Sequence, residues 1–353
     1  MKTKRLICFV LICHIVALLA SCRAADPTTE ASISFAWAYR AGDYVRGTPA
    51  VSDQVVYVGA DDNALHAVSA ATGELIWSYE TADNVTSSPV VSQGRVTFGS
   101  WDGTVYALDA GQGELRWRYE TDGWVTASPV ISDGVLYVGS HDGFLYALGA
   151  EDGDLVWRYE TGGRIAAGAS LAKGIVLVGS SDNYLYALDI AGGELAWRYR
   201  TEGDIVTRPA VAGGIVTVGS LDRKLYALDA ASGQLRWVFQ AGYAIESSPV
   251  VADGLLYVGA NDGRLYALDA YDGRLIWQYR AGDTVRSSPA VWGNLVFVGS
   301  DDGSVYGLDR VAGSLVWRYR TGGAVAAGPA VAGGRLFVGS TDRRLHAFDL
   351  DAE

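Results

Sequence analysis

Cysteine is scarce in this chain. Only three cysteines occur in 353 residues, and Cys8 and Cys13 lie in an apolar stretch at the N-terminus that we expect to be removed. Cys22 is then the only cysteine of the mature protein. One cysteine can form neither an internal disulfide nor a cysteine-based metal site, so both are excluded.

Positive charge is also in short supply. The chain has 28 basic residues against 40 acidic ones, and its formal net charge is −12. Lys2, Lys4 and Arg5 belong to the N-terminal stretch, so its removal leaves a more acidic protein. General nucleic-acid binding depends on basic contacts to phosphates. The charge balance therefore argues against nucleic acid as a partner.

Histidine is rare, and its placement does not suggest catalysis. His14 lies in the N-terminal stretch, whereas His66 and His346 occupy a position where other segments have tyrosine, as at Tyr106. We interpret these two histidines as packing substitutes. No Ser/His/Asp arrangement and no set of ligands at metal-binding spacing is evident. We predict no catalytic residue and no metal site.

A long hydrophobic run is missing as well. Residues 6–19 form a 14-residue apolar run broken only by a histidine, which is shorter than the about 20 residues of a membrane-spanning helix. The run ends in Leu19-Ala20-Ser21-Cys22, which resembles the lipobox of bacterial lipoprotein precursors. That resemblance implies cleavage before Cys22 and a diacylglycerol on its thiol. Ordinary signal-peptidase cleavage near Ala24 is the alternative.

What the chain has in abundance is repetition with a period of 40 residues. A strict period of this length indicates a repeat architecture. One copy contains four apolar segments, at 88–91, 95–100, 104–109 and 114–121, separated by turns rich in Gly and Asp. Eight copies of four short strands predict an all-β, eight-bladed β-propeller. The repeat is marked by the tryptophans Trp37, Trp77, Trp117, Trp157, Trp197, Trp237, Trp277 and Trp317.

The ends of the repeat series predict how the ring closes. The first repeated segment, residues 33–40, is of the fourth-strand type, and the chain ends after a third strand at 344–350. We predict that 33–40 pairs beside 345–349 and completes the eighth blade, which removes the free edge. The predicted domains are a signal peptide at 1–21, a lipidated tether at 22–32 and the propeller at 33–353.

Other constant positions have structural explanations. Gly59, Gly99 and their counterparts end the second strand, where a side chain would collide with a neighbouring blade. In the fourth strand we expect Leu115, Trp117 and Tyr119 to share one face. An aspartate also recurs in the turn after the second strand, but one carboxylate per turn is too few for a calcium loop. We interpret it as turn chemistry.

The segment from third to fourth strand carries a family resemblance. Ala107-Leu108-Asp109, Gly113-Glu114 and Trp117 recur at fixed spacing, and this pattern resembles the tryptophan-docking motif of the quinoprotein (PQQ-like) eight-bladed propellers. The resemblance implies that each indole stacks on the alanine of its motif and on a glycine peptide of an adjacent blade. Quinoprotein dehydrogenases of that family also carry a calcium site, a catalytic aspartate and adjacent disulfide-bonded cysteines. The chain offers no match to these, so neither PQQ nor calcium is expected.

The lipobox, the tether and the propeller without insertions together resemble the BamB family of envelope lipoproteins. The resemblance implies a non-enzymatic scaffold that binds partner proteins of the outer-membrane β-barrel assembly machinery. Arg23 after the predicted lipidated cysteine is compatible with sorting to the outer membrane. The expected location is the periplasmic side of the outer membrane, or the outer face of the cell membrane if the source has one membrane. A PQQ-dependent dehydrogenase is the less favoured alternative.

Binding residues are expected where the repeats differ. The loops from the fourth strand of one blade to the first strand of the next vary most, and they should surround the mouth of the axial channel. The alternative is that these side chains are merely solvated. The candidates are Tyr44, Arg46, Arg164, Asp204, Arg208, Glu246 and Arg286.

Three further residues predict a sharper cluster. Trp101 lies in a turn between second and third strands and Trp124 in the next loop between blades, so both should reach the same face on adjacent blades. His141 is equivalent to Trp101, one blade further. Exposed tryptophans among variable polar residues are typical of a binding hot spot; a glycan or small ligand is the alternative occupant, and capping of a blade core the alternative role. Trp292 should lie on the opposite face and pack locally.

Overall fold

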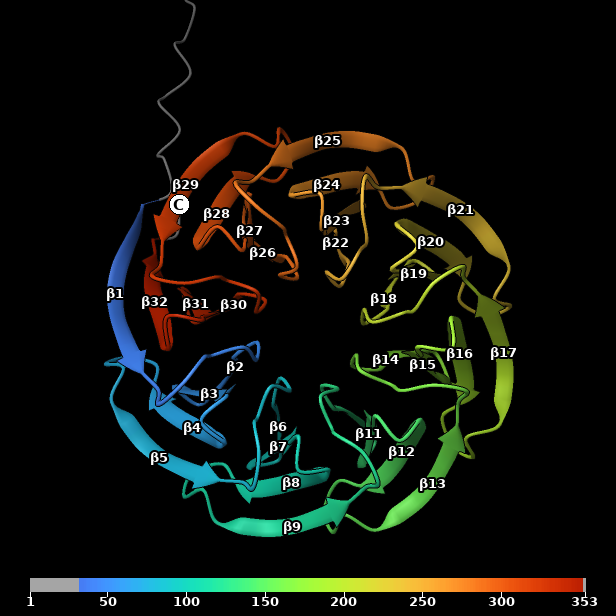
Figure 1. Ribbon diagram of the computed structural model, residues 1–353, viewed down its shortest axis with the longest axis horizontal. Coiled ribbons are helices and arrows are strands. Elements are labelled where there is room, and N and C mark those ends of the chain that lie inside the picture. Colours follow the sequence, from blue (N-terminus) through green and yellow to red (C-terminus); the bar gives the residue numbers. More distant parts are fainter. Residues whose placement is uncertain (1–31, 352–353) are drawn as a thin grey trace, which may run out of the picture.

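The computed structural model describes residues 32–351, which form a ring of eight four-stranded antiparallel sheets around a central axis (Figure 1). The predicted fold is confirmed. Within the described range, none of the secondary structure is a helix that could cross a membrane. Cys22 and the predicted boundaries of the signal peptide and tether lie outside these residues.

Each blade is built from an innermost strand to an outer strand. In seven blades all four strands follow one another directly in the sequence, and in the blade that closes the ring three do. The innermost strands are short. They are β2 (Ala50–Ser52), β6 (Val90–Ser92), β10 (Val130–Ser132), β14 (Ser170–Ala172), β18 (Ala210–Ala212), β22 (Val250–Ala252), β26 (Ala290–Trp292) and β30 (Ala330–Ala332). The second strands are β3 (Val55–Ala60), β7 (Arg95–Gly99), β11 (Val135–Gly139), β15 (Ile175–Gly179), β19 (Ile215–Gly219), β23 (Leu255–Ala260), β27 (Leu295–Gly299) and β31 (Arg335–Ser340).

The remaining two strands complete each blade toward its rim. The third strands are β4 (Ala64–Ser69), β8 (Thr104–Asp109), β12 (Phe144–Gly149), β16 (Tyr184–Asp189), β20 (Lys224–Asp229), β24 (Arg264–Asp269), β28 (Ser304–Asp309) and β32 (Arg344–Leu350). The outer strands are β5 (Leu75–Glu80), β9 (Leu115–Glu120), β13 (Leu155–Glu160), β17 (Leu195–Arg200), β21 (Leu235–Gln240), β25 (Leu275–Arg280), β29 (Leu315–Arg320) and β1 (Ile33–Arg40). We number the blades 1 to 8 from β2–β5 to the blade of β30, β31, β32 and β1.

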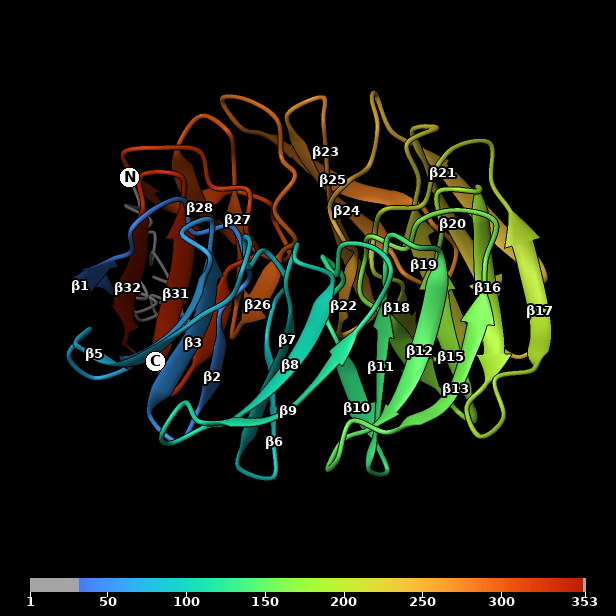
Figure 2. The same cartoon turned by 60° about the horizontal axis from the view of Figure 1, so that its bottom comes forward.

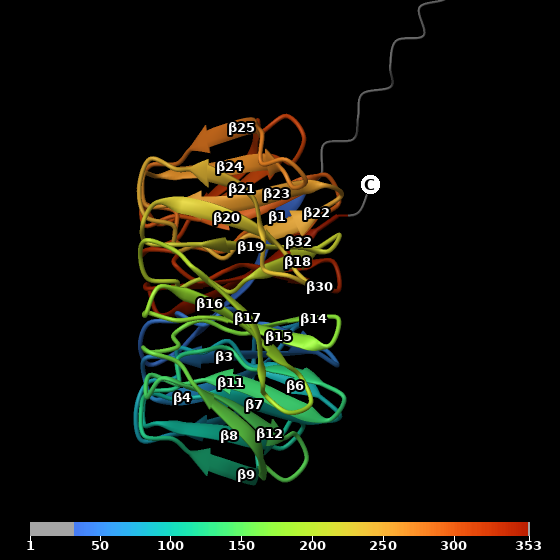
Figure 3. The ribbon, with the colours of Figure 1, turned by 90° about the vertical axis from the view of Figure 1, so that its right-hand side faces the viewer.

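The two flat faces of the disc carry different loops (Figures 2 and 3). On one face lie the turns between second and third strands and the loops that lead from one blade to the next. We call this the variable face. The opposite face carries the turns between first and second and between third and fourth strands. There the turn between β2 and β3 places both Asp53 and Gln54 at positive φ, 49° and 65°, a combination that type I′ hairpin turns require.

The apolar core lies between adjacent blades rather than at the axis. One cluster joins Val105, Ala107 and Trp117 of blade 2 to Leu136 and Val138 of blade 3, all of them buried. Six of the eight repeated tryptophans also link neighbouring blades through a hydrogen bond. The indole nitrogen of Trp77 donates to the carbonyl of Ala110 in the next blade over 3.1 Å.

The recurring aspartate holds the variable face together. The Oδ1 atom of Asp102 accepts the backbone N–H of Thr104 at 2.9 Å, while Oδ2 accepts the Tyr106 hydroxyl at 2.8 Å and the backbone N–H of Ala82, in the loop from the previous blade, at 3.1 Å. His346 replaces the tyrosine in blade 8 and binds Asp342 at 2.9 Å. The histidine there keeps the polar contact to the aspartate, which is more than a packing substitute does.

A bulge in the outer strand corrects one expectation. Ala107 pairs with Trp117 but Leu108 pairs with Leu115, so the register shifts by one residue between them. Leu115 therefore leaves the face that Trp117 and Tyr119 share, and 43% of its surface is exposed. The sequence alternation alone placed Leu115 inward, because a bulge between the two residues has no signature in the apolar pattern.

The ring closes as predicted. β1 pairs antiparallel with β32 from Ile33↔Leu350 to Arg40↔Arg344, and both lie in the same blade in Figure 1. Trp37 of β1 then donates its indole N–H to the carbonyl of Ala70 in blade 1 at 3.1 Å. Blades 8 and 1 thus meet through the same tryptophan hydrogen bond as blades 1 and 2.

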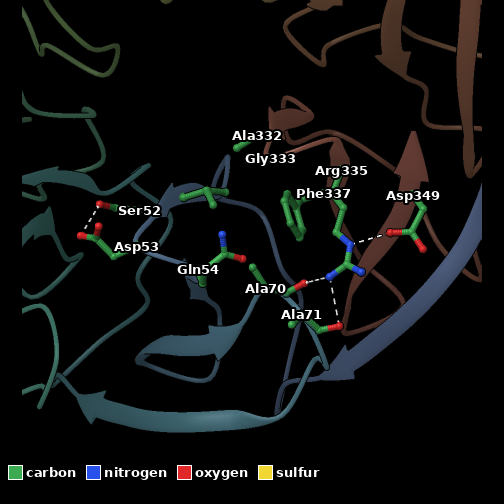
Figure 4. Close-up of a pocket in the computed structure, with 11 residues that line it drawn as sticks. Ser52, Asp53, Gln54, Ala70, Ala71, Ala332, Gly333, Arg335, Phe337 and Asp349 are labelled. Atoms are coloured by element: carbon green, nitrogen blue, oxygen red, sulfur yellow. Dashed lines mark hydrogen bonds and ion pairs between the residues drawn. The ribbon is translucent and has the colours of Figure 1, made fainter. Parts of the chain in front are cut away.

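An arginine reinforces this seam from the opposite face (Figure 4). Arg335 of blade 8 donates to Asp349 at 2.6 Å, to the carbonyl of Ala71 in blade 1 at 3.0 Å, and to the carbonyl of Ala70. The hollow of about 470 Å³ beside it is lined by residues of both blades. Because the guanidinium already has these partners, we assign Arg335 to the closure of the ring.

Candidate binding face and axial channel

Three variable positions recur on the variable face of every blade. In blade 1 they are Tyr44, Arg46 and Asp61. The backbone N–H of Asp61 donates to the carbonyl of Tyr44 at 2.8 Å, and the equivalent bond joins His141 to Trp124 at 2.8 Å. The backbone geometry is therefore constant while the three side chains change from blade to blade.

Side chains at the second and third of these positions contact each other within a blade, 15 residues apart in sequence. Arg46 binds Asp61 at 2.6 Å and Arg286 binds Asp301 at 2.5 Å. The amide of Asn261 donates to Glu246 at 2.6 Å. This pairing was missed in the sequence, although a constant separation of 15 between complementary residues is a signal that could have shown it.

The structure brings Trp101, Trp124 and His141 together. Trp101 of blade 2 stacks on Trp124 of blade 3 with ring centroids 4.7 Å apart and an angle of 13° between the planes. The His141 ring lies 5.6 Å from that of Trp124. We call these three residues the aromatic cluster. Trp124 remains 48% exposed, so the cluster presents an aromatic surface to solvent.

Hydrogen bonds fix the outer members of the aromatic cluster. The indole nitrogen of Trp101 donates to the hydroxyl of Thr86 at 2.7 Å. The Nε2 atom of His141 lies 2.9 Å from the hydroxyl of Thr126. Each threonine lies 15 residues before its ring, the separation of the recurring pairs, so Trp101 and His141 are each tied to their own blade. The ring of Trp124 contacts both.

The charge state of the cluster follows from its surroundings. Burial lowers the pKa of His141, and the nearby positive charge of Arg164 lowers it further. His141 is therefore neutral at neutral pH. Arg164 itself contacts Ser181 at 3.2 Å through its Nε atom. The result is an uncharged aromatic patch next to one cation, on a protein whose net charge is −12.

The other candidates lie on the same face but away from the cluster. Arg46, Glu246 and Arg286 are each paired within their own blade, and the guanidinium of Arg46 lies over the ring of Tyr44 at 5.1 Å. Burial raises the pKa of Asp61, although its bond to Arg46 acts against this. Asp204 supplies its carbonyl to the recurring backbone bond.

A ring of hydroxyl groups lines the axial channel, and sequence reasoning missed it. The backbone N–H of Thr48 donates to the hydroxyl of Ser88 at 3.1 Å, and that of Ser88 donates to the hydroxyl of Ser128 at 3.1 Å. Blades 5 to 7 repeat the contact, from Arg208 to Ser248 at 3.0 Å and onward. These residues are 40 apart, so the repeat itself contained the signal.

The channel has a volume of about 620 Å³ and is lined by hydroxyl, proline, valine and alanine side chains. Arg208, which we expected at the mouth of the channel, lies in its wall. It is the one charged residue among the lining residues of the described chain. Trp292 ends β26 on the opposite face and packs against the core between blades 7 and 8, as predicted.

The side chains that line the channel offer no set of calcium ligands. Calcium requires several carboxylate or carbonyl ligands, and the side chains that line the channel include neither carboxylates nor amides. Elsewhere in residues 32–351, no group of three or more His, Cys, Asp or Glu side chains is placed to hold a metal ion.

Comparison with known families gives an extensive match. The sequence model of the family described as outer membrane protein assembly factor BamB matches residues 28–89, 82–204, 162–283 and 280–353. Among curated proteins, none matches the sequence closely enough to be counted as a relative.

Several solved structures share the fold. BamB from Moraxella catarrhalis is 23% identical, with a TM-score of 0.79 over 90% of this chain and 100% of that one. The computationally designed Ika8 protein is 19% identical, with a TM-score of 0.81 over 90% and 99% of the two chains. Quinohemoprotein alcohol dehydrogenase from Comamonas testosteroni is 17% identical, with a TM-score of 0.78 over 91% and 77%. At these identities the likeness shows the fold alone, since BamB, a designed protein and a dehydrogenase all share it.

Proposed function

Because the chain belongs to the family of the outer membrane protein assembly factor BamB, we propose that it is a non-enzymatic envelope scaffold that binds partner proteins during outer-membrane protein assembly. The observation that carries this proposal is the aromatic cluster. It is an exposed, hydrogen-bonded group of large rings on the variable face, while the neighbouring candidates on that face are paired within their own blades.

The aromatic cluster has the physical properties of a protein-binding hot spot. Tryptophan is enriched at such sites because it contributes a large contact area with little loss of side-chain entropy. Trp101 and His141 both contact the ring of Trp124, so this ring needs little reorganisation when a partner covers it. Arg164 adds a single positive charge at the edge of the patch, and a partner with an acidic residue beside an apolar side chain would complement both.

We propose further that the protein is anchored through a lipid on Cys22. The strand β1 begins with Ile33, which pairs with Leu350, and Leu350 bonds to Gly334 in a turn of the opposite face. The tether therefore meets the propeller on the face away from the aromatic cluster. About ten residues reach at most ~35 Å, so a lipid anchor would direct the cluster away from the membrane. Replacing Cys22 by serine should release the protein from membranes and abolish incorporation of labelled fatty acid.

We also propose that the protein functions without PQQ or calcium. The cysteines of the chain all lie within residues 1–22, so the propeller lacks the cysteine pair of the quinoprotein dehydrogenases, and the channel lacks the ligands for calcium. Incubation with PQQ, calcium and a primary alcohol should reduce no redox dye. Alcohol-dependent dye reduction would overturn this proposal and favour the dehydrogenase alternative.

The scaffold proposal is tested by crosslinking in cells followed by purification of the lipidated protein. The test variant is the double substitution Trp101→Ala/Trp124→Ala. The matched control is Tyr271→Ala, because Tyr271 is an aromatic residue 79% exposed in a turn of the opposite face. Wild type and control should recover components of the outer-membrane barrel-assembly machinery, and the double variant should lose them.

Two results would contradict the proposal. Equal recovery with the double variant would show that the cluster does not bind the partner. Recovery of glycan without any protein partner would instead favour the alternative function, a glycan-binding propeller in which the exposed ring of Trp124 stacks on a sugar. Circular dichroism of each variant, compared with wild type, shows that any loss of binding is not a loss of fold.

A further inference from the structure

The axial channel departs from its own repeat at three positions. The position held by Thr48 and Ser88 carries a hydroxyl in five of the eight blades, and the exceptions are Gly168, Arg208 and Gly328. The ring of hydrogen bonds is interrupted at these three positions. Only Arg208 places a long, charged side chain where the other blades have a small residue, so its presence in the channel calls for a functional explanation.

A neighbouring residue is changed in a way that accommodates Arg208. Ser170 stands where other blades have alanine or valine. It accepts a hydrogen bond from the Nε atom of Arg208 at 3.2 Å and donates one to the carbonyl of Pro209 at 2.5 Å. A Cβ atom at Gly168 would lie 2.8 Å from the carbonyl oxygen of Ser128, so the glycine there is explained by the neighbouring backbone and not by the arginine. The contact with Ser170 is therefore what orients the guanidinium of Arg208.

The terminal nitrogens of that guanidinium have no anionic partner in the described chain. Among residues 32–351 no carboxylate forms an ion pair with Arg208, whereas Arg46 and Arg286 on the variable face each bind an aspartate. The side chain of Arg208 is exposed to solvent in the channel, and partial desolvation by the surrounding wall lowers its pKa. A positive charge in such surroundings is stabilised by an anion.

We propose that the axial channel is a binding site for a small organic anion whose carboxylate or phosphate group is held by Arg208. A planar guanidinium presents paired donors to such a group. The hydroxyls of Ser88, Ser128 and Ser248 supply further donors, and the proline and valine walls contact the apolar part of the ligand. The volume of about 620 Å³ lies within the ordinary range of small-molecule sites.

The substitution Arg208→Ser tests the site without endangering the fold. It restores the residue type of the equivalent positions, and its hydroxyl can accept the backbone N–H of residue 168 as Ser88 accepts that of Thr48. The variant should therefore be at least as stable as wild type. The matched control is Arg46→Ser, which removes an arginine of the variable face that already has a partner.

The experiment is isothermal titration calorimetry at low ionic strength with citrate, benzoate and inorganic phosphate, each titrated separately. We expect saturable binding of at least one probe to wild type and to Arg46→Ser, and a loss of about tenfold or more in affinity in Arg208→Ser. The pattern among the three probes shows whether carboxylate or phosphate is preferred. Absence of saturable binding to wild type, or equal affinity in Arg208→Ser, would overturn the proposal. Because Arg208→Ser leaves the aromatic cluster intact, partner recovery in the crosslinking assay is unaffected by either result.

Discussion

Deleting β1 tests the closure of the ring. In a protein that begins at residue 41 instead of residue 32, the ladder from Ile33↔Leu350 to Arg40↔Arg344 is lost and β32 becomes a free edge. Trp37 is lost with it. Its side chain is 9% exposed, contacts Phe337 in its own blade, and donates its N–H to blade 1. The deletion therefore removes both the last strand of blade 8 and the contact that joins this blade to blade 1.

The size of the effect follows from Trp37 alone. Replacing a buried tryptophan by alanine costs about 3–5 kcal/mol, and the backbone ladder adds to this. We expect the deletion to lower the free energy of unfolding by at least about 3 kcal/mol, a large share of the roughly 5–15 kcal/mol that stabilises a folded protein. The point variant Trp37→Ala should show the side-chain part without exposing an edge.

Urea denaturation and size-exclusion chromatography measure the two consequences. The deletion variant, compared with the protein beginning at residue 32, should unfold at lower urea and should self-associate, because an unpaired strand edge is a template for pairing with other chains. Trp37→Ala should lose stability and remain monomeric. A deletion variant that unfolds within about 1 kcal/mol of the control and stays monomeric would refute the reasoning, since that value is within the cost of an ordinary substitution.

Three further predictions concern single residues. The buried indole N–H of Trp237 has no hydrogen-bond partner, whereas that of Trp77 has one. In chemical denaturation, Trp77→Phe should therefore lower the free energy of unfolding by about 1 kcal/mol more than Trp237→Phe does. Equal losses in the two variants would contradict this. Because burial lowers the pKa of His141 below 6.5, the unfolded chain takes up the proton first, so stability falls as pH drops below that value; thermal melts from pH 8 to 5 should show a shallower loss for His141→Gln than for wild type. Gly99→Ala would place a Cβ atom 2.3 Å from Cγ1 and 2.5 Å from the carbonyl oxygen of Val125, so it should destabilise by about 1–3 kcal/mol, and an unchanged melting temperature would show that the adjacent blade gives way.

The fold could be predicted from the sequence because the tryptophans, the turn residues and the apolar segments all recur with the same period. The 40-residue spacing of Trp77 and its equivalents fixes the number of blades, and the incomplete first and last repeats fix the closure by β1. The placement of Trp101 beside Trp124 also followed, since the propeller topology puts these two loops on one face of adjacent blades. Because the repeat gives the relative position of adjacent blades, contacts between residues far apart in the sequence could be predicted from it.

Contacts that depend on small geometric details were not predictable. The exposed position of Leu115 results from a bulge that shifts the register by one residue, and the apolar pattern does not record it. The position of Arg208 in the channel wall depends on Ser170 in the preceding blade, and only the packed ring shows that these side chains meet. The pairing of Arg46 with Asp61 differs from these, because the constant separation of 15 residues could have shown it in the sequence.

The pairs on the variable face have a consequence for how this protein can diversify. Arg46 with Asp61 and Glu246 with Asn261 each form their contact inside a single blade, so exchanging one pair leaves the remaining blades undisturbed. Each blade thus acts as a separate cassette in a fixed frame. Suppose that the gene gains a repeat at one end and loses one at the other. The side chains of the variable face would then shift by one blade of the eight, and the blades that remain would keep their neighbours around the ring. Selection can therefore change the side chains of the variable face one blade at a time, while the fold of the other blades stays the same.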